Sequence, residues 1–242
     1  MMHGLTLKTR KRKRRLRVFL CLLIFIFYFL NIGIFIPTFT LIIFELRNEI
    51  RQFIRQLLGK NLFEGYDKLF KRHVKGINIY GEYGVGNSTK WVYKNTDAKI
   101  IAVDTSQEWI DIVQSKMKDL DRVQIEWVDL GELGEWGTPL SYKKRDFIRN
   151  YLESIWKNQH KPELVLIDGR FRVACFLYSL LKSDPGSKII FDDYKKITHY
   201  QVVEEFIKPI ESHGNQVLFI VPDMLPIEKI EKTISEFIHV LE

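Results

Sequence analysis

The strongest constraint on the fold is a series of short apolar segments that alternate with helix-forming segments. Residues 77–80, 99–103, 122–128, 164–167 and 188–191 have the length and composition of buried strands. Strands that alternate with helices over residues 76–242 predict an α/β doubly wound sheet with helices on both faces. Ligands of such sheets bind at the carboxyl ends of the strands.

Acidic residues follow these predicted strands closely. The carboxyl ends of parallel strands meet at one edge of a sheet, so we expect these side chains to gather there. Two of them stand next to each other after the fifth strand. The strand-end acids are Glu82, Asp104, Asp129, Asp168, Asp192 and Asp193.

A glycine cluster follows the first strand, in the pattern Glu82-x-Gly84-x-Gly86. Ser88 is a candidate N-cap for a helix that begins there. A strand, glycine turn and helix together present backbone N–H groups and a positive helix end to a ligand. The dinucleotide fingerprint requires a third glycine, and Thr89 occupies that position.

Asp104 ends the second strand, about 20 residues after the glycines, which is where a carboxylate binds the two ribose hydroxyls of a cofactor. Its alternative role is to cap the helix that begins near Gln107. The spacing from the glycine loop favours the ligand-binding role.

Together these motifs resemble motif I and the later strand ends of class I S-adenosylmethionine (SAM)-dependent methyltransferases, and the resemblance covers about residues 76–221. It implies a Rossmann-like methyltransferase fold that binds SAM, with the acid and the loop holding the amino-acid end of the cofactor. Asp129 matches the acid that reads the adenine amino group. The implied cofactor-binding residues are Glu82, Gly84, Gly86, Ser88, Asp104 and Asp129.

Asp168-Gly169 and Asp192-Asp193 resemble the fourth and fifth strand ends of small SAM-dependent methyltransferases. In the related catechol-type O-methyltransferases, acids at these strand ends bind a divalent metal. By position, Asp168, Asp192 and Asp193 match those ligands, and oxygen ligands suit Mg²⁺ or Mn²⁺. A metal would activate an acceptor hydroxyl. Without one, a carboxylate would act as general base.

Arg170 and Arg172 depart from that pattern. They can pair with the acids and replace the metal, bind an acidic acceptor such as a uronate or phosphate, or form salt bridges at the rim. We assign Asp168, Arg170 and Asp192 as candidate catalytic residues.

The net charge of +7 comes from the N-terminus: residues 1–17 carry eight basic residues and no acid, which leaves a charge of −1 for the rest. A nearly neutral domain does not indicate a nucleic-acid partner.

Residues 18–44 contain no charged residue. As a helix they would measure roughly 40 Å, against a hydrocarbon core of about 30 Å. They predict one transmembrane helix and a lipid-bilayer partner, although Asn31, Gly33 and Pro37 also allow a kinked or re-entrant anchor. The basic tail predicts a cytosolic N-terminus. A single span then puts the domain outside the cytosol, whereas SAM is made inside.

The expected organisation is a basic tail over 1–17, an anchor over 18–44, a linker helix over 45–75, and the SAM-binding domain over 76–242. The glycine-rich loop 130–142 has the composition of a lid or specificity loop. We expect a membrane-anchored SAM-dependent methyltransferase that acts on an oxygen of a small-molecule, glycan or lipid-linked acceptor.

Two other functions fit the same layout. A type II membrane glycosyltransferase has a short basic tail, an anchor, a stem and an α/β domain, and Asp192-Asp193 would then hold a metal–nucleotide. The glycine motif has no role in such a site. A non-catalytic anchored protein that keeps the fold is the second alternative.

Overall fold

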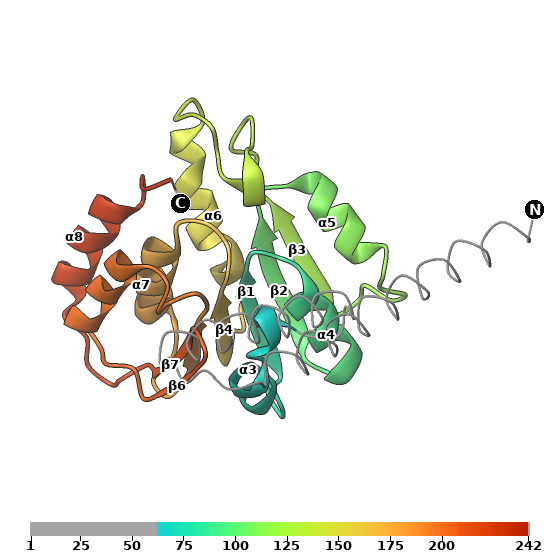
Figure 1. Ribbon diagram of the computed structural model, residues 1–242, viewed down its shortest axis with the longest axis horizontal. Helices are drawn as coiled ribbons and strands as arrows, with labels where there is room; N and C mark the ends of the chain where they lie inside the picture. Colours follow the sequence, from blue (N-terminus) through green and yellow to red (C-terminus); the bar gives the residue numbers. More distant parts are fainter. Residues whose placement is uncertain (1–61, 242) are drawn as a thin grey trace, which may run out of the picture. The chain divides into compact units, whose positions relative to one another are not determined.

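A computed structural model describes residues 62–241 (Figure 1). Its centre is a seven-stranded sheet in the order β3-β2-β1-β4-β5-β7-β6. The strands β1 to β5 pair in parallel with their neighbours, whereas β7 runs antiparallel to both β5 and β6. The strands are β1 (Ile79–Tyr83), β2 (Lys99–Asp104), β3 (Val123–Trp127), β4 (Leu164–Ile167), β5 (Lys188–Phe191), β6 (Glu211–His213) and β7 (Gln216–Ile220).

Helices cover both faces of this sheet, as the alternation of the sequence predicts (Figure 1). On one side lie α3 (Lys68–His73), α4 (Asn87–Asn95) and α5 (Gln107–Gln114). On the other lie α6 (Ile148–Glu153), α7 (Arg172–Lys182) and α8 (Ile227–Phe237), with the 3-10 helix η5 (Thr198–Glu205). From β1 the chain adds β2 and β3 toward one edge of the sheet, and then β4 and β5 toward the other edge. The topological switch point therefore lies between β1 and β4.

Alternate residues of each central strand point into two separate cores. In β4, Val165 and Ile167 belong to the core with α6, α7 and α8, whereas Leu164 and Leu166 belong to the core with α3, α4 and α5. All four are fully buried. This explains why the strand is a continuous apolar run.

The first strand lies further along the chain than the expected segment 77–80. It includes Gly81 and Glu82, which pair with residues of both β2 and β4. A Cβ at Gly81 would lie 2.8 Å from Cγ of Pro162, so glycine is needed there for packing. Glu82 is therefore inside the sheet, and not in the turn after it.

The helix expected over 45–75 does not run continuously through the described residues 62–75. A 3-10 turn, η1 (Phe63–Gly65), precedes α3 and is separated from it. Phe63, Glu64 and Gly65 all have positive φ, which no α-helix accommodates. Leu62, Leu69, Phe70 and Val74 pack into the core on the α3 face.

The segment 142–159 is divided into η3 (Arg145–Phe147), α6 and η4 (Ser154–Trp156). The Ser154 hydroxyl donates to the carbonyl of Asn150 at the second break, which disturbs helical bonding. The segment after β5 forms the 3-10 helix η5. The C-terminal stretch forms the helix α8, and the short strand β6 pairs antiparallel with β7.

The predicted anchor over 18–44 and the basic tail lie outside the described residues. Within residues 62–241, none of the helices has the length and apolar character needed to cross a bilayer.

Candidate cofactor and acceptor site

Two backbones approach each other closely at the switch point between β1 and β4. Gly84 follows β1 with a φ of 86°, and a Cβ there would lie 2.7 Å from Cα of Gly169. A Cβ at Gly169 would in turn lie 2.7 Å from the Gly84 nitrogen. Glycine at both positions lets the loop after β1 pack directly on the Asp168-Gly169 turn after β4.

Gly86 serves a different purpose in the same loop. Its φ of −178° is extended backbone that any residue adopts. A Cβ built on Gly86 would meet nothing within 4 Å. The space beside Gly86 is therefore open for a ligand to approach the backbone.

The loop uses its own N–H groups internally, contrary to the expectation that they are free. The N–H of Gly84 donates to the carbonyl oxygen of Val103 at 2.9 Å. The N–H of Val85 donates to Oδ2 of Asp104 at 2.9 Å. That of Gly86 donates to Oγ1 of Thr89 at 2.8 Å. A phosphate-binding loop keeps these groups available, so this loop is not built for a pyrophosphate.

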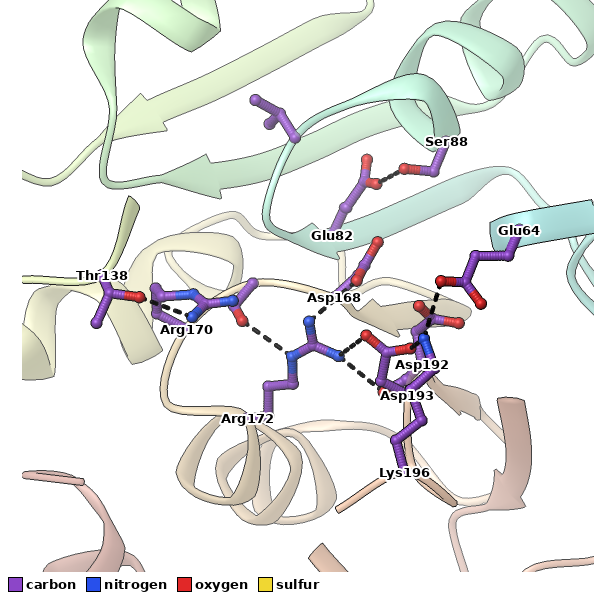
Figure 2. Close-up of polar contacts among 12 residues, drawn as sticks. Glu64, Glu82, Ser88, Thr138, Asp168, Arg170, Arg172, Asp192, Asp193 and Lys196 are labelled. Carbon is purple, nitrogen blue, oxygen red and sulfur yellow. Dashed lines mark hydrogen bonds and ion pairs between the residues drawn. The ribbon is translucent and has the colours of Figure 1, made fainter. Parts of the chain in front are cut away.

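Glu82 is fully buried at the end of β1 and binds the first turn of α4. The hydroxyl of Thr89 donates to Oε2 of Glu82 at 2.6 Å, and the hydroxyl of Ser88 donates to Oε1 (Figure 2). Ser88 therefore lies inside the helix, bonded to Glu82, while Gly86 occupies the N-cap position. Burial raises the pKa of Glu82 to about 8, against the lowering effect of the two hydroxyls.

Asp104, at the tip of β2, holds the glycine loop and the next helix together. Besides the N–H of Val85, its carboxylate accepts the N–H of Ser106 at 2.9 Å. Ser106 itself caps α5, since its hydroxyl accepts from the N–H of Trp109. Burial raises the pKa of Asp104, and the backbone donors oppose this. Asp104 thus lies beside the glycine loop, where a ribose-binding acid is expected.

The glycine-rich loop 130–142 lies against the ends of β2 and β4. The carbonyl oxygen of Gly137 accepts the hydroxyl of Thr105 at 2.8 Å. Arg170 Nη1 donates to Oγ1 of Thr138 at 3.0 Å, and Arg170 points away from the acids that follow β5 (Figure 2). Its Nε atom is buried without a hydrogen-bond partner. Arg170 therefore belongs to the loop side of the site.

Asp129 lies on an open part of the site, with 42% of its side chain exposed. It forms an ion pair with Lys144 and accepts the N–H of Gly131 at 2.9 Å. The hydrogen bond from Lys144 lowers the pKa of Asp129. In this arrangement Asp129 orders the start of the loop.

Asp168, Asp192 and Asp193 come together at the ends of β4 and β5, with a ligand atom of each within 4.8 Å of the others. The guanidinium of Arg172 lies among them (Figure 2). It is 3.2 Å from Oδ1 of Asp168 and 3.6 Å from Oδ2 of Asp193. Arg172 also donates to the carbonyl oxygens of Gly169 at 3.0 Å and Asp192 at 2.8 Å.

The position of Arg172 disfavours the divalent metal expected at Asp168, Asp192 and Asp193. Three carboxylates suit Mg²⁺ in number and chemistry, but Arg172, with only 8% of its side chain exposed, already brings a fixed positive charge to two of them. A divalent ion would have to share these carboxylates with a guanidinium that cannot lose its proton. The residues present therefore do not fit a metal while Arg172 holds this position.

Burial dominates the electrostatics of the cluster. It raises the pKa of Asp168 to about 6, against the lowering effect of Arg172. It raises the pKa of Asp192, which is 7% exposed, well above the usual value. Carboxylates with raised pKa values at a sheet edge are suited to accepting protons near neutral pH.

A small cavity of about 100 Å³ opens beside Asp192 and Asp193. Lys196 is one of the residues that line it, and its Nζ pairs with Oδ1 of Asp193 at 2.7 Å and with Oε1 of Glu64 at 3.1 Å (Figure 2). The remaining lining comes from η1 and from the turn before β7. The lining residues are Phe63, Glu64, Tyr66, Asp192, Asp193, Lys196, Asn215 and Gln216.

Sequence reasoning missed Glu64, Lys196 and Gln216 because none of them belongs to a motif. Glu64 was assigned to the linker, and Gln216 begins an antiparallel strand whose position at this edge depends on the fold. Tyr151 and Tyr194 are buried in the core.

Comparisons with known proteins support the same fold. No family model matches this chain, and no curated protein matches it. Among solved structures, a methyltransferase-like protein from Silicibacter pomeroyi DSS-3 is 26% identical with a TM-score of 0.59, over 69% of this chain and 92% of that one.

Two further structures are more distant. The N-methyltransferase NodS from Bradyrhizobium japonicum WM9, in complex with S-adenosyl-L-homocysteine (SAH), is 11% identical with a TM-score of 0.47, over 69% of this chain and 91% of that one. An O-methyltransferase from Bacillus cereus, also in complex with SAH, is 15% identical with a TM-score of 0.40, over 83% of this chain and 88% of that one. Together with the sheet order and the switch-point loop, the Silicibacter protein shows that residues 62–241 have a Rossmann-like α/β fold of the methyltransferase kind.

Proposed function

We propose that this protein is a SAM-dependent methyltransferase. The observation that carries the proposal is the loop between β1 and α4, whose open Gly86 lies beside the strand-end acids Glu82 and Asp104 at the switch point of a methyltransferase-like sheet. Gly84, Gly86 and Ser88 complete the proposed cofactor site, and Asp129 is the proposed adenine contact. The internal use of the loop N–H groups disfavours a nucleotide-sugar at this loop.

SAM, when bound, supplies a methyl group on a positively charged sulfur. The acidic residues along the sheet edge are suited to hold such a cation and to take the proton that the acceptor loses. Asp192, buried with a raised pKa, is the proposed proton acceptor, and Asp168 is the second candidate. Arg172 holds both acids in place through its contacts with Asp168 and the Asp192 backbone. Arg170 is proposed to position the loop 130–142 through Thr138.

Calorimetric titration of the full chain with SAH tests the cofactor. We expect micromolar binding that Asp104→Asn weakens by about tenfold or more, since Asn keeps the shape but loses one acceptor oxygen and the charge. Asp184→Asn, at an exposed acid paired with Lys161, is the matched control. Tight binding of a UDP-sugar with none of SAH would refute the proposal in favour of a glycosyltransferase. SAH binding without methyl transfer to any acceptor would point to the non-catalytic alternative.

We also propose that residues 18–44 anchor the enzyme in a lipid bilayer with the N-terminus in the cytosol. The proposal rests on the uncharged apolar run and the basic tail before it. Recovery of the full chain in the membrane fraction is the measurement that tests it.

A further inference from the structure

The cavity beside Asp192 has an excess of negative charge. Glu64, Asp192 and Asp193 line it, against the single cation Lys196. Lys196 is fully engaged with Glu64 and Asp193. Arg172, which does not line the cavity, pairs with Asp168 and Asp193. Among the described residues, these ion pairs leave the Asp192 carboxylate without one of its own.

A second observation points to a ligand in the same place. Gln216 is fully buried and lines the cavity, yet neither its Oε1 nor its Nε2 has a hydrogen-bond partner. It lies close enough to Asp192 to lower the pKa of that carboxyl, without forming a bond of normal geometry. A buried amide without hydrogen-bond partners is destabilising, so such a group calls for a ligand or water to satisfy it.

The composition of the cavity selects the ligand. The carboxylate of Asp192 and the amide oxygen of Gln216 both accept hydrogen bonds, so a ligand must bring N–H or O–H groups. The excess of acidic over basic lining residues favours a ligand whose donor group is positively charged. The rings of Phe63 and Tyr66 also line the cavity and suit a cation. Its volume of about 100 Å³ is well below the roughly 300–1,000 Å³ of pockets for drug-sized ligands, so it takes only a small group.

We infer that this cavity binds the protonated amino group of a small amine, with Asp192 and Gln216 as its hydrogen-bond acceptors. The identification of that amine as one end of the methyl acceptor rests on the proposed function. An amine acceptor takes the place of the alternative in which Arg170 and Arg172 bind an acidic acceptor, since Arg172 pairs with the strand-end acids and Arg170 bonds to Thr138. The segment Phe63–Tyr66 then forms part of the acceptor site.

Three two-carbon probes test the inference: ethanolamine, ethylene glycol and glycolate. Each is titrated into the full chain, and its binding is followed by saturation-transfer NMR. We expect ethanolamine to bind about ten- to a hundredfold more tightly than ethylene glycol, and glycolate to bind weakest. Asp192→Asn and Gln216→Leu should each remove most of the preference for ethanolamine, whereas Asp184→Asn should keep it. Circular dichroism of each variant confirms that it is folded.

Equal binding of ethanolamine and ethylene glycol would overturn the inference, because the site would then recognise hydroxyl groups. Preference for glycolate, or absence of ethanolamine binding to the wild type, would also overturn it. SAH binding measured on the same samples separates the two proposals. Intact SAH binding with no amine preference contradicts only the acceptor inference, and amine binding without SAH binding contradicts only the proposed function.

Discussion

Glu82 is buried against two hydroxyl groups of the helix that follows it, and this sets a testable pH dependence. Its pKa is raised from about 4.5 to about 8 in the folded protein. Between these values the folded state holds a proton that the unfolded state has lost. The contribution of Glu82 to the free energy of unfolding of the protein therefore decreases as the pH rises from about 4.5 to 8, and it changes little above that.

The variant Glu82→Gln removes this titration while keeping the size of the side chain and an acceptor for the hydroxyls of Ser88 and Thr89. We expect urea unfolding between pH 5 and 8 to show a smaller loss of stability in the variant than in the wild type. Asp168 and Asp192 also have raised pKa values and contribute in the same direction in both proteins. Because the charge of Glu82 raises the pKa of Asp168, the difference reports Glu82 together with this coupling. The exposed Glu108→Gln is the control, and an unchanged pH profile for Glu82→Gln would contradict the prediction.

At the scale of elements, Arg172 joins the start of α7 to the ends of β4 and β5. Its removal leaves Asp168 without its ion-pair partner and Asp193 with Lys196 alone. Since both carboxylates are partly exposed, the cost should be below the roughly 3–5 kcal/mol of a fully buried pair. We expect Arg172→Gln to lower the melting temperature at pH 7. The carboxylates would then no longer share the guanidinium of Arg172, so millimolar Mg²⁺ should restore part of the stability of this variant.

Thermal unfolding with and without Mg²⁺ measures this effect. The wild type should show no gain from Mg²⁺, because Arg172 already supplies the positive charge. Arg149→Gln, which removes an exposed pair with Glu153, should lose little stability and gain nothing from Mg²⁺. Stabilisation of the wild type by Mg²⁺ to the same degree as the variant would show that Arg172 does not take the place of a metal.

The elements that sequence alone predicts well are those in which one physical signal dominates. The strands β4 and β5 begin and end as predicted, because strands buried on both faces are continuous apolar runs. The end of β1 was predicted too early, at residue 80, because Gly81 and Glu82 resemble turn residues. Only the packing of Pro162 on Gly81 and the buried hydroxyls bonded to Glu82 explain why both belong to the strand.

The same contrast holds for the candidate site. Acids at strand ends could be placed at one edge of the sheet, because parallel strands bring their carboxyl ends together. Pairing of Arg170 and Arg172 with these acids was one of the predicted alternatives, and Arg172 forms such pairs. Sequence could not show that only one of the two arginines does so, since they are two residues apart and Arg170 turns to Thr138 instead. Glu64 and Gln216 reach the cavity only through long-range contacts of η1 and β7, for which no local pattern exists.

For the whole molecule, the arrangement of a basic tail, an apolar segment and a methyltransferase-like domain predicts integral membrane association. We expect the full chain to stay in the membrane fraction through high salt and alkaline carbonate. Association through the basic tail alone would be released by salt, since charge attraction at a surface is screened. The double variant Ile24→Lys and Phe27→Lys should weaken insertion by roughly 2.5–3.5 kcal/mol per lysine. The matched control Arg14→Gln and Arg15→Gln should still pellet with membranes.

Protease protection of the full chain in sealed vesicles then decides on which side of the bilayer the domain lies. A cytosolic N-terminus and a single span would place the α/β domain on the far side, where the proposed cofactor SAM would have to be supplied by transport. A domain digested from the cytosolic side would instead require a re-entrant anchor or the opposite orientation, and would give the enzyme direct access to cytosolic SAM. Release of the full chain by salt alone would contradict the anchor itself, and the apolar run 18–44 would then need another partner.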